Sequence, residues 1–202
     1  MAKKRLRNHT NPLNFRDRLT HFAEFVNQQE FNALDLEIGF GRGRFIESYA
    51  KRHPERFSVA VEVRKNMVEL FKQRVQLPNV LPIWGPAHIC LDDVITNQSL
   101  SRVFIFHPDP WFKKRHFKRR VLTLDLINAL QQKLLPEGIV YISTDVFDLY
   151  EDMLNLCRTY GNLELIDNDP FWDTDYMTHW SMFSTKDQRS QYFITFKFKE
   201  SE

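Results

Sequence analysis

The stretch LDLEIGFGRGRF, residues 34–45, decides the fold class of this 202-residue chain. Its apolar first half is typical of a buried β-strand, and the residues at its end open a helical pattern. Glycines at positions 39, 41 and 43 permit a tight turn and a close approach of the backbone to a ligand. The spacing is GxGxG, and Arg44 stands where the dinucleotide fingerprint requires glycine. The stretch therefore predicts a strand–loop–helix unit of an α/β sheet, although glycines after a strand are often simple turn residues.

Strand and helix patterns alternate outward from this stretch. Helical periods predict helices at residues 15–29, 44–52, 65–75, 88–96, 121–135 and about 147–159. Apolar runs predict strands at 33–38, 57–63, 79–85, 101–107, 138–144, 163–169 and 190–200, with a polar, aromatic-rich loop between the last two. Pro82 predicts that the strand at 79–85 lies at a sheet edge or is irregular. The alternation predicts a mostly parallel sheet with helices on both faces, and the last two strands predict an antiparallel addition at one edge.

The composition indicates one domain that can bury a core, since 43% of the residues are hydrophobic. We expect a basic, flexible tail at residues 1–14 and a single domain at 15–202. No apolar run approaches the roughly 20 residues that span a bilayer, and no apolar signal-peptide segment follows the basic N-terminus. Cys90 and Cys157 have no paired spacing, and the seven histidines show no metal-binding pattern. These features predict a cytoplasmic protein in a reducing compartment, without a metal ion.

Positive charge is concentrated in two clusters of four and six residues. The other 18 basic residues stand against 26 acidic residues, so the rest of the chain has a net charge of −8. This segregation predicts a surface for a polyanion, although runs of Lys and Arg, the N-terminal run in particular, are ordinarily solubilising surface. The N-terminal cluster consists of Lys3, Lys4, Arg5 and Arg7, and the second, called the basic block below, consists of Lys113, Lys114, Arg115, Lys118, Arg119 and Arg120.

Two acidic residues near the glycines indicate the kind of ligand. Glu37 precedes the glycines, where it would oppose a phosphate but suits a cationic ligand such as a sulfonium with an amino-acid tail. Glu62 lies near the end of the next predicted strand, where an acid accepts hydrogen bonds from ribose hydroxyls. These acids, together with Gly39 and Gly41, predict a binding site for S-adenosyl-L-methionine rather than for NAD.

The segment FIFHPDPWFKKRHFKRR, residues 104–120, carries the candidate substrate site. A buried strand delivers Asp109 to the same sheet edge as the glycines, and prolines on both sides stiffen its backbone. The carboxylate can accept hydrogen bonds from N1–H and N2–H of guanine, a donor pair that adenine lacks, and Trp111 offers a flat face for a base. The basic block follows directly and suits a phosphate backbone. The alternative interpretation is a rigid turn with a solvated Asp109 and a core Trp111.

With these residues the chain resembles the bacterial, single-subunit tRNA (guanine-N7-)-methyltransferase family. The string from the prolines through the basic block is a specific signal, whereas many methyltransferases share the glycine loop. The resemblance extends over most of the chain and rests on LEIGFGRGRF at 36–45, VEV at 61–63, FHPDPWFKKRHFKRR at 106–120, STD at 143–145 and STKDQRS at 184–190.

The resemblance implies an α/β, Rossmann-like class I methyltransferase fold, with a mostly parallel seven-stranded sheet, one antiparallel strand and helices on both faces. It implies methyl transfer from S-adenosyl-L-methionine to N7 of the guanine at position 46 in the variable loop of tRNA. A monomer or homodimer without an obligate protein partner would carry out this reaction, and no metal ion is implied.

The resemblance also implies roles for individual residues. Asp109 falls on the position regarded as catalytic, near both cofactor and base. The other cofactor-binding positions are Glu37, Gly39, Gly41 and Glu62, and the substrate-binding positions are Lys113, Asp145, Ser184, Thr185, Lys186 and Asp187.

Two segments depart from the family pattern, at three positions. Pro86 stands where the family usually has an Asp that helps to hold the cofactor, and Ser184 and Asp187 replace a Thr and a Glu. Pro86 therefore motivates an alternative, an RNA-binding protein on the same scaffold that has lost use of the cofactor. Methylation of another nucleic acid or of a protein is a third interpretation.

Overall fold

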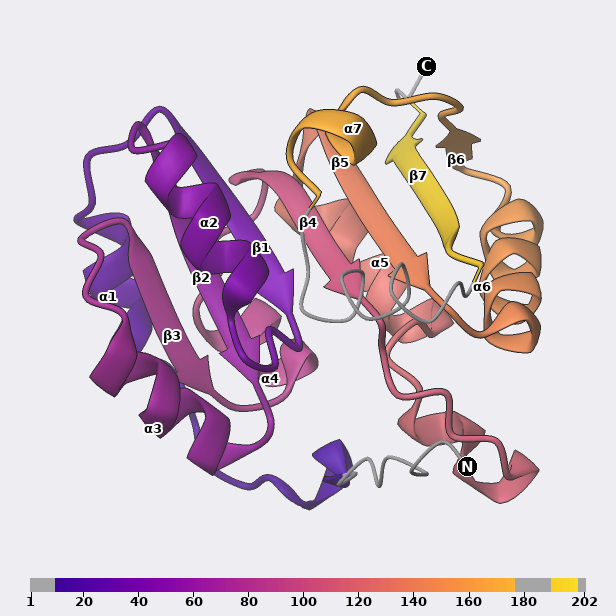
Figure 1. The fold of residues 1–202 in the computed structure, drawn as a ribbon, viewed down its shortest axis with the longest axis horizontal. Helices are drawn as coiled ribbons and strands as arrows, with labels where there is room; N and C mark the ends of the chain where they lie inside the picture. Colours follow the sequence, from indigo (N-terminus) through magenta and orange to yellow (C-terminus); the bar gives the residue numbers. More distant parts are fainter. Residues whose placement is uncertain (1–9, 177–189, 200–202) are drawn as a thin grey trace.

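The structure is a computed structural model that describes residues 10–176 and 190–199 (Figure 1). No helix within these ranges is long and apolar enough to cross a membrane. The elements, with η for short 3-10 helices, are η1 (Pro12–Asn14), α1 (His21–Asn27), β1 (Ala33–Ile38), α2 (Arg44–Arg52), β2 (Arg56–Glu62), α3 (Lys65–Arg74), β3 (Val80–Trp84), α4 (Ala87–Asp93), β4 (Leu100–Phe106), η2 (Lys114–Arg119), α5 (Leu124–Lys133), β5 (Leu134–Thr144), α6 (Phe147–Tyr160), β6 (Leu163–Leu165), α7 (Phe171–Thr174) and β7 (Tyr192–Phe198).

The strands of the described residues form one seven-stranded sheet in the order β3-β2-β1-β4-β5-β7-β6. The first five of these strands pair in parallel, whereas β7 pairs antiparallel with both β5 and β6. The predicted sheet with one reversed strand is therefore confirmed. Pro82 lies in β3 at the edge, as predicted, because proline has no N–H for a second ladder. The chain passes from this edge back to β4 beside β1, and open α/β sheets bind ligands where the strand order reverses in this way.

Apolar side chains point alternately to the two faces of the sheet and form two cores. Helices α1, α4, α5 and α6 cover one core, and α2, α3 and α7 cover the other. Along β4, Val103 and Ile105 belong to the first core and Phe104 and Phe106 to the second, as the two-residue period of a strand requires. Figure 1 shows α2 and α3 in front of the sheet and α4 and α5 behind it. Packing on both faces holds the strand ends, where the candidate site lies, in fixed positions.

The predicted helix at 15–29 is wrong over its first six residues, since α1 begins at His21. The backbone N–H of Leu19 donates to the buried carboxylate of Asp93 at 2.7 Å, and Arg18 pairs with the same carboxylate at 2.5 Å. These contacts attach the segment before α1 to α4. The backbone N–H of Leu19 therefore forms its hydrogen bond with a side chain of α4 and not with a carbonyl of its own helix.

The loop predicted between the last two strands contains α7, which the sequence analysis did not predict. A four-residue helix is too short to be stable through its own hydrogen bonds. Phe171 of α7 is buried, with its ring 4.1 Å from that of Tyr141 and 5.3 Å from that of Phe104. Packing on the aromatic second core therefore stabilises this turn.

We expect Gly43→Ala to lower the thermal stability strongly. Gly43 has φ of +68°, which costs about 1–2 kcal/mol for a residue with a side chain, and its Cβ would overlap the buried ring of Phe71. Gly161→Ala is the matched control, because Gly161 has φ of +81° but no atom within 4 Å of the added Cβ. Thermal unfolding of both variants measures the difference. Equal loss of Tm in the two would show that Phe71 does not constrain the glycine loop.

Candidate functional site

The carboxyl ends of β1, β2 and β4 lie side by side around a cavity of about 550 Å³. The loop after β1 contributes Gly39, the end of β2 contributes Glu62 and the turn after β4 contributes Asp109. Three residues that the sequence analysis assigned to one site thus line one cavity. Its charged lining residues are the acids Glu62, Asp92, Asp109 and Asp125 and the cations Arg64, Lys118, Arg119 and Arg120.

The glycine loop leaves open space beside the cavity. Gly39 has φ of +78°, a conformation that favours glycine, and its N–H donates to the carbonyl of Val61 at 2.7 Å. A Cβ at this position would meet nothing within 4 Å. The backbone is therefore fixed by β2 on one side and free to approach a ligand on the other.

Glu62 is held in place by the backbone around it. Its carboxylate accepts the N–H of Gly41 at 2.9 Å and the N–H of Arg64 at 3.0 Å. The guanidinium of Arg64 adds a bidentate pair at 2.9 and 2.8 Å. An acid in this position presents oxygens to ribose hydroxyls, and any hydroxyl that binds Glu62 shares the carboxylate with Arg64 or displaces it.

Arg64 is a site residue that the sequence analysis missed. Hydrogen bonds to Glu62 raise the pKa of Arg64, against the effect of burial, and the negative charges of Glu62 and Asp109 raise it further. The guanidinium thus links electrostatically the two cavity acids that come from different strands. The position of Arg64, two residues after Glu62, is the one feature of the sequence that could have indicated its role. The electrostatic interaction with Asp109 could not have been predicted, because it depends on the fold.

Glu37 lies in β1 with 3% of its surface exposed. Burial raises the pKa of its carboxyl to about 8, the charge of Glu62 adds to the rise, and a hydrogen bond from the Ile46 backbone opposes it. Within the described residues its Oε2 has no hydrogen-bond partner. The raised pKa favours the neutral form of Glu37, and a cation bound nearby would favour the ionised form. Glu37 is not among the residues that line the cavity, so an effect on a ligand there would act through the field of the carboxylate.

We expect the contribution of Glu37 to the free energy of unfolding to fall as the pH rises from about 4.5 to about 8, so that the free energy of unfolding of the parent falls relative to that of Glu37→Gln over this range. In this window the folded protein keeps the Glu37 proton that the unfolded chain releases, so raising the pH favours unfolding. Urea unfolding at several pH values measures the difference between the two proteins. Parallel pH profiles would contradict the raised pKa.

The turn that carries Asp109 has a strained backbone held from both sides. His107 and Trp111 have φ of +48° and +44°, which cost energy for residues with side chains. The His107 N–H donates to the carbonyl of Ser143 at 2.8 Å, and Nε of Arg120 donates to the carbonyl of Pro110 at 3.0 Å. The carboxylate predicted to be catalytic therefore sits on a turn that the surrounding structure holds.

Two arginines of the basic block are part of this turn. Arg120 pairs with Asp152 at 2.6 Å and lies over the ring of Phe117 at 3.7 Å. Arg119 lies over the ring of Trp111 at 5.1 Å. A cation thus covers one face of the Trp111 ring, and the ring of His116 packs against Trp111 with the two ring centres 5.6 Å apart. A base that stacks on Trp111, as predicted from the sequence, would have to share the ring with these neighbours.

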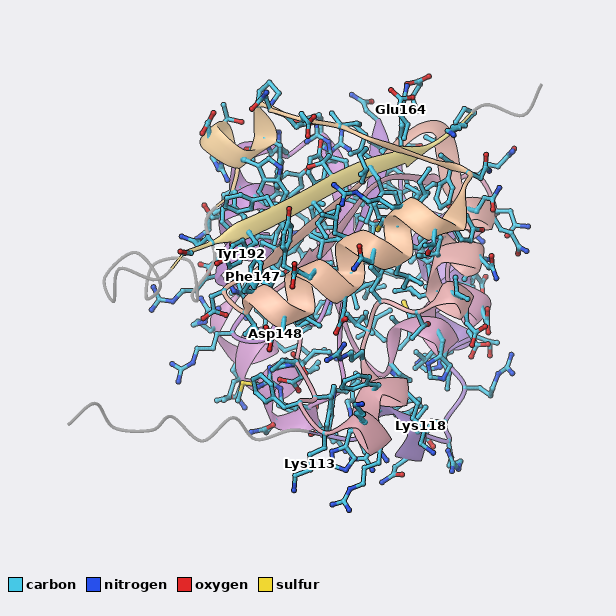
Figure 2. All side chains as sticks on the ribbon, turned by 90° about the vertical axis from the view of Figure 1, so that its right-hand side faces the viewer. Lys113, Lys118, Phe147, Asp148, Glu164 and Tyr192 are labelled. Atoms are coloured by element: carbon cyan, nitrogen blue, oxygen red, sulfur yellow. The ribbon has the colours of Figure 1, made fainter. Side chains whose placement is uncertain are left out.

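Lys113 lies outside the cavity, on the adjoining surface. It is exposed and immediately precedes η2. Figure 2 shows Lys113 and Lys118 at the same end of the molecule, on the segment that projects from the sheet. Lys118 also lines the cavity, so η2 connects the cavity with an exposed basic surface.

Asp145 follows β5 and faces the Asp109 turn from the side. Only 3% of its side chain is exposed, and its Oδ1 lies 3.6 Å from Nδ1 of His107.

Pro86 lines the cavity at the start of α4, and Asp92 of α4 lines the same cavity. Among the described residues, no group of three or more His, Cys, Asp or Glu side chains could hold a metal ion. The predicted substrate residues Ser184, Thr185, Lys186 and Asp187 lie outside the described residues.

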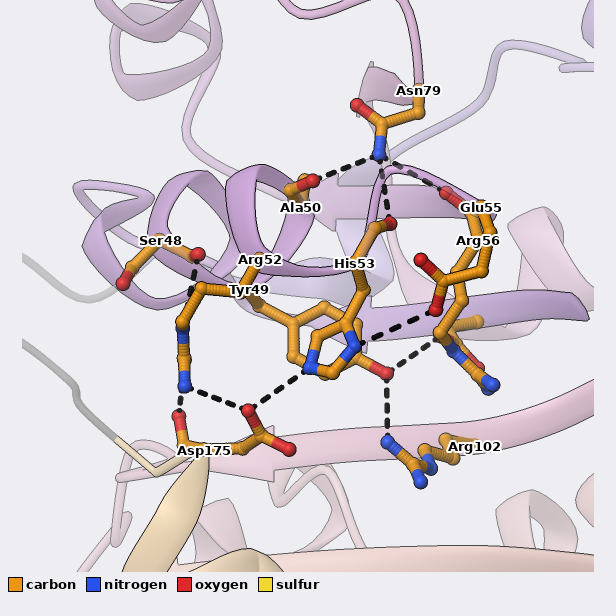
Figure 3. Close-up of polar contacts among 11 residues, drawn as sticks. Ser48, Tyr49, Ala50, Arg52, His53, Glu55, Arg56, Asn79, Arg102 and Asp175 are labelled. Carbon is orange, nitrogen blue, oxygen red and sulfur yellow. Dashed lines mark hydrogen bonds and ion pairs between the residues drawn. The ribbon is translucent and has the colours of Figure 1, made fainter.

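A cluster of polar contacts, which could not be expected from the sequence, connects α7 and the residue after it with the end of α2 (Figure 3). Nη1 of Arg52 donates to the Asp175 carboxylate at 2.7 Å and to the carbonyl of Thr174 at 2.8 Å. Nε2 of His53 lies 3.0 Å from the same carboxylate. These residues are more than 120 positions apart in the chain, so no local pattern could have paired them.

Comparison with known proteins identifies the family. The model of a family described as "Putative methyltransferase" matches residues 32–193. The tRNA (guanine-N(7)-)-methyltransferase of Thermosynechococcus vestitus is 35% identical over 163 residues, which cover 78% of this chain and 76% of the relative. The protein of that name from Prochlorococcus marinus strain AS9601 is 31% identical, and the match covers 94% of this chain and 93% of the relative. The chain belongs to the tRNA (guanine-N7-)-methyltransferase family.

Solved structures confirm the fold of this family member. The 16S rRNA methyltransferase KamB has a TM-score of 0.61 at 15% identity, covering 88% of this chain and 94% of that one. The aminoglycoside resistance methyltransferase NpmB1 has a TM-score of 0.58 at 15% identity, covering 87% and 93%. The likeness establishes the predicted class I methyltransferase fold, and the cavity of this tRNA (guanine-N7-)-methyltransferase family member lies at the strand ends where such α/β sheets bind their ligands.

Proposed function

We propose that this protein transfers a methyl group from S-adenosyl-L-methionine to N7 of the guanine at position 46 in the variable loop of tRNA. Family membership supports the reaction and the substrate class. The observation that carries the proposal for this chain is that Gly39, Glu62 and Asp109 line a single cavity whose other charged residues include cations of the basic block. We further propose that the reaction takes place in the cytoplasm.

The residues around the cavity suit S-adenosyl-L-methionine. Glu62 offers carboxylate oxygens to ribose hydroxyls, and the space beside Gly39 admits a ligand against the backbone. Glu37, beneath the loop, gains negative charge when a cation binds nearby. When bound, the donor supplies a methyl group on a positively charged sulfur.

The purine requires little proton chemistry from the protein. Guanine N7 has an in-plane lone pair and no proton, so its attack on a methyl group needs no general base. The contribution of Asp109 is to hold the base edge by hydrogen bonds and to favour the positive charge that develops on the purine. Lys113 and the exposed surface of η2 suit the phosphates around the base.

The test is a methyl-transfer assay with radiolabelled S-adenosyl-L-methionine and undermodified tRNA, followed by nucleoside analysis. We expect label in 7-methylguanosine and none in a tRNA whose position 46 is adenosine. Transfer of label to another nucleoside or to protein would contradict the proposed substrate. The rival function, RNA binding without catalysis, predicts tRNA binding without incorporation of label, and Pro86 in the cavity wall is the observation that favours it.

A further inference from the structure

A chain of polar side chains runs beside the Asp109 turn, and of its members only Asp145 has been given a role above. The hydroxyl of Tyr176 lies 2.9 Å from Oγ of Ser143 and 2.8 Å from Nε2 of His107. Nδ1 of His107 in turn faces Oδ1 of Asp145 at 3.6 Å. The side chains of His107 and Asp145 are only 1% and 3% exposed, so water screens their interaction weakly.

The orientation of this chain follows from its chemistry. A neutral imidazole has one N–H, and the negative charge of Asp145, 3.6 Å from Nδ1 and beyond hydrogen-bond distance, favours that proton on Nδ1. Nε2 is then the acceptor for the Tyr176 hydroxyl, whose oxygen accepts in turn from Ser143. The single hydroxyl proton of Tyr176 has a second acceptor within reach, Oε1 of Gln191, but at 3.4 Å it is the more distant of the two. The imidazole thus joins a carboxylate after β5 to the segment after α7.

His107 is also coupled to Asp109 through the backbone. It is separated from Asp109 only by Pro108, whose ring fixes φ and restricts the residue before it. The positive φ of His107 is strained, and contacts of its side chain and its N–H hold the turn in this conformation together with the bond from Arg120 to Pro110. Loss of the contact between the imidazole and Tyr176 would therefore remove one of the restraints on the turn that carries Asp109.

We propose that His107 is a positioning residue for methyl transfer, which uses its contacts with Tyr176 and Asp145 to fix the Asp109 turn against the base. The proposal rests on the proposed function. His107 lines the same cavity as Asp109, and the role we assign to its imidazole is one of orientation, without a share in the bonds that form and break. It sets the orientation of the Asp109 carboxylate and holds the Asp145 carboxylate at the side of the same turn. A displacement of about 1 Å at a reacting centre can lower turnover by up to about a hundredfold.

The experiment compares His107→Phe, which removes both ring nitrogens, with His107→Gln, whose side-chain amide can take the place of Nε2. Tyr176→Phe removes the partner hydroxyl alone. Tyr160→Phe is the control, because the Tyr160 hydroxyl binds Asn128 and Gln131 between α6 and α5. The readouts are kcat and KM for tRNA in the labelled transfer assay, the Kd of S-adenosyl-L-methionine, and Tm.

We expect kcat to fall at least about tenfold in His107→Phe and in Tyr176→Phe, with KM for tRNA and the cofactor Kd within about twofold of the parent. His107→Gln should recover much of the loss, and Tyr160→Phe should match the parent. The double variant His107→Phe/Tyr176→Phe should lose little more than His107→Phe alone, because His107→Phe already removes the contact that Tyr176→Phe removes.

Parent-like kcat in Tyr176→Phe and in a folded His107→Phe would overturn the inference while leaving the proposed function intact. If His107→Phe does not fold, Tyr176→Phe decides alone, since it removes a single oxygen atom. A loss in Tm without a change in kcat would also overturn it, because it would show a purely structural role. A parent protein that transfers no methyl group to tRNA would instead overturn the proposed function.

Discussion

Replacing Asp109 with asparagine is expected to lower kcat for tRNA methylation by about a hundredfold or more, while the Kd for tRNA changes by less than about twofold. The substitution keeps the size and the planar shape of the side chain and removes its charge. It also replaces one acceptor oxygen with an amide nitrogen, which cannot accept from N1–H or N2–H of guanine. Most tRNA affinity should persist because it comes from phosphate contacts.

The measurement combines single-turnover methyl transfer with filter binding of tRNA to the same preparations. Asp148→Asn is the matched control, since Asp148 is an exposed acid in the first turn of α6, outside the cavity lining. A parent rate in Asp109→Asn would show that the assignment of Asp109 is wrong. Loss of tRNA binding together with activity would place Asp109 in substrate binding and remove it from the chemical step.

The second large effect is expected at Glu62, where Glu62→Gln should weaken S-adenosyl-L-methionine binding by about ten- to a hundredfold. A hydrogen bond to a charged group contributes about 1.5–3 kcal/mol, and the neutral amide offers one acceptor in place of two. The variant also releases Arg64 from its bidentate pair with Glu62, so the guanidinium, whose charge Asp109 also stabilises, is no longer held in a fixed position.

Isothermal titration calorimetry on parent and variant measures the Kd, and Tm separates weak binding from misfolding. Glu164→Gln is the control, because Glu164 is an exposed residue of β6, where Figure 2 shows it far from Lys113 and Lys118. An unchanged Kd in Glu62→Gln would remove Glu62 from the cofactor site. Undetectable binding by the parent protein at millimolar ligand would count against the cofactor itself.

Much of the fold could be predicted because it depends on local properties. The helix at 44–52 was predicted with the bounds that α2 has, since its apolar period is clear and His53-Pro54 ends it. The edge position of β3 followed from one residue, Pro82. The start of α1 and the presence of α7 could not be predicted, because Asp93 and the aromatic second core, both distant in sequence, stabilise those segments.

The same division holds for the candidate site. Gly39, Glu62 and Asp109 could be assigned to one cavity because each follows or ends a parallel strand, and such strands end at a common edge. The roles within the basic block could not be predicted. In the sequence its six cations differ little, because each is identified only by its positive charge. In the structure Arg120 donates a hydrogen bond to the carbonyl of Pro110, whereas Lys113 is exposed.

By itself, the sequence determined the order of strands and helices, the glycine loop and the strand ends that carry acids, because periodicity, backbone freedom and strand direction are properties of neighbouring residues. Only the tertiary structure decided which of these groups are charged and what they touch. The raised pKa of Glu37, the position of Arg64 between two acids and the contact of His107 with Tyr176 all depend on burial and on partners from distant segments. Burial removes water, and electrostatic interactions that would be weak in solution then determine protonation and orientation.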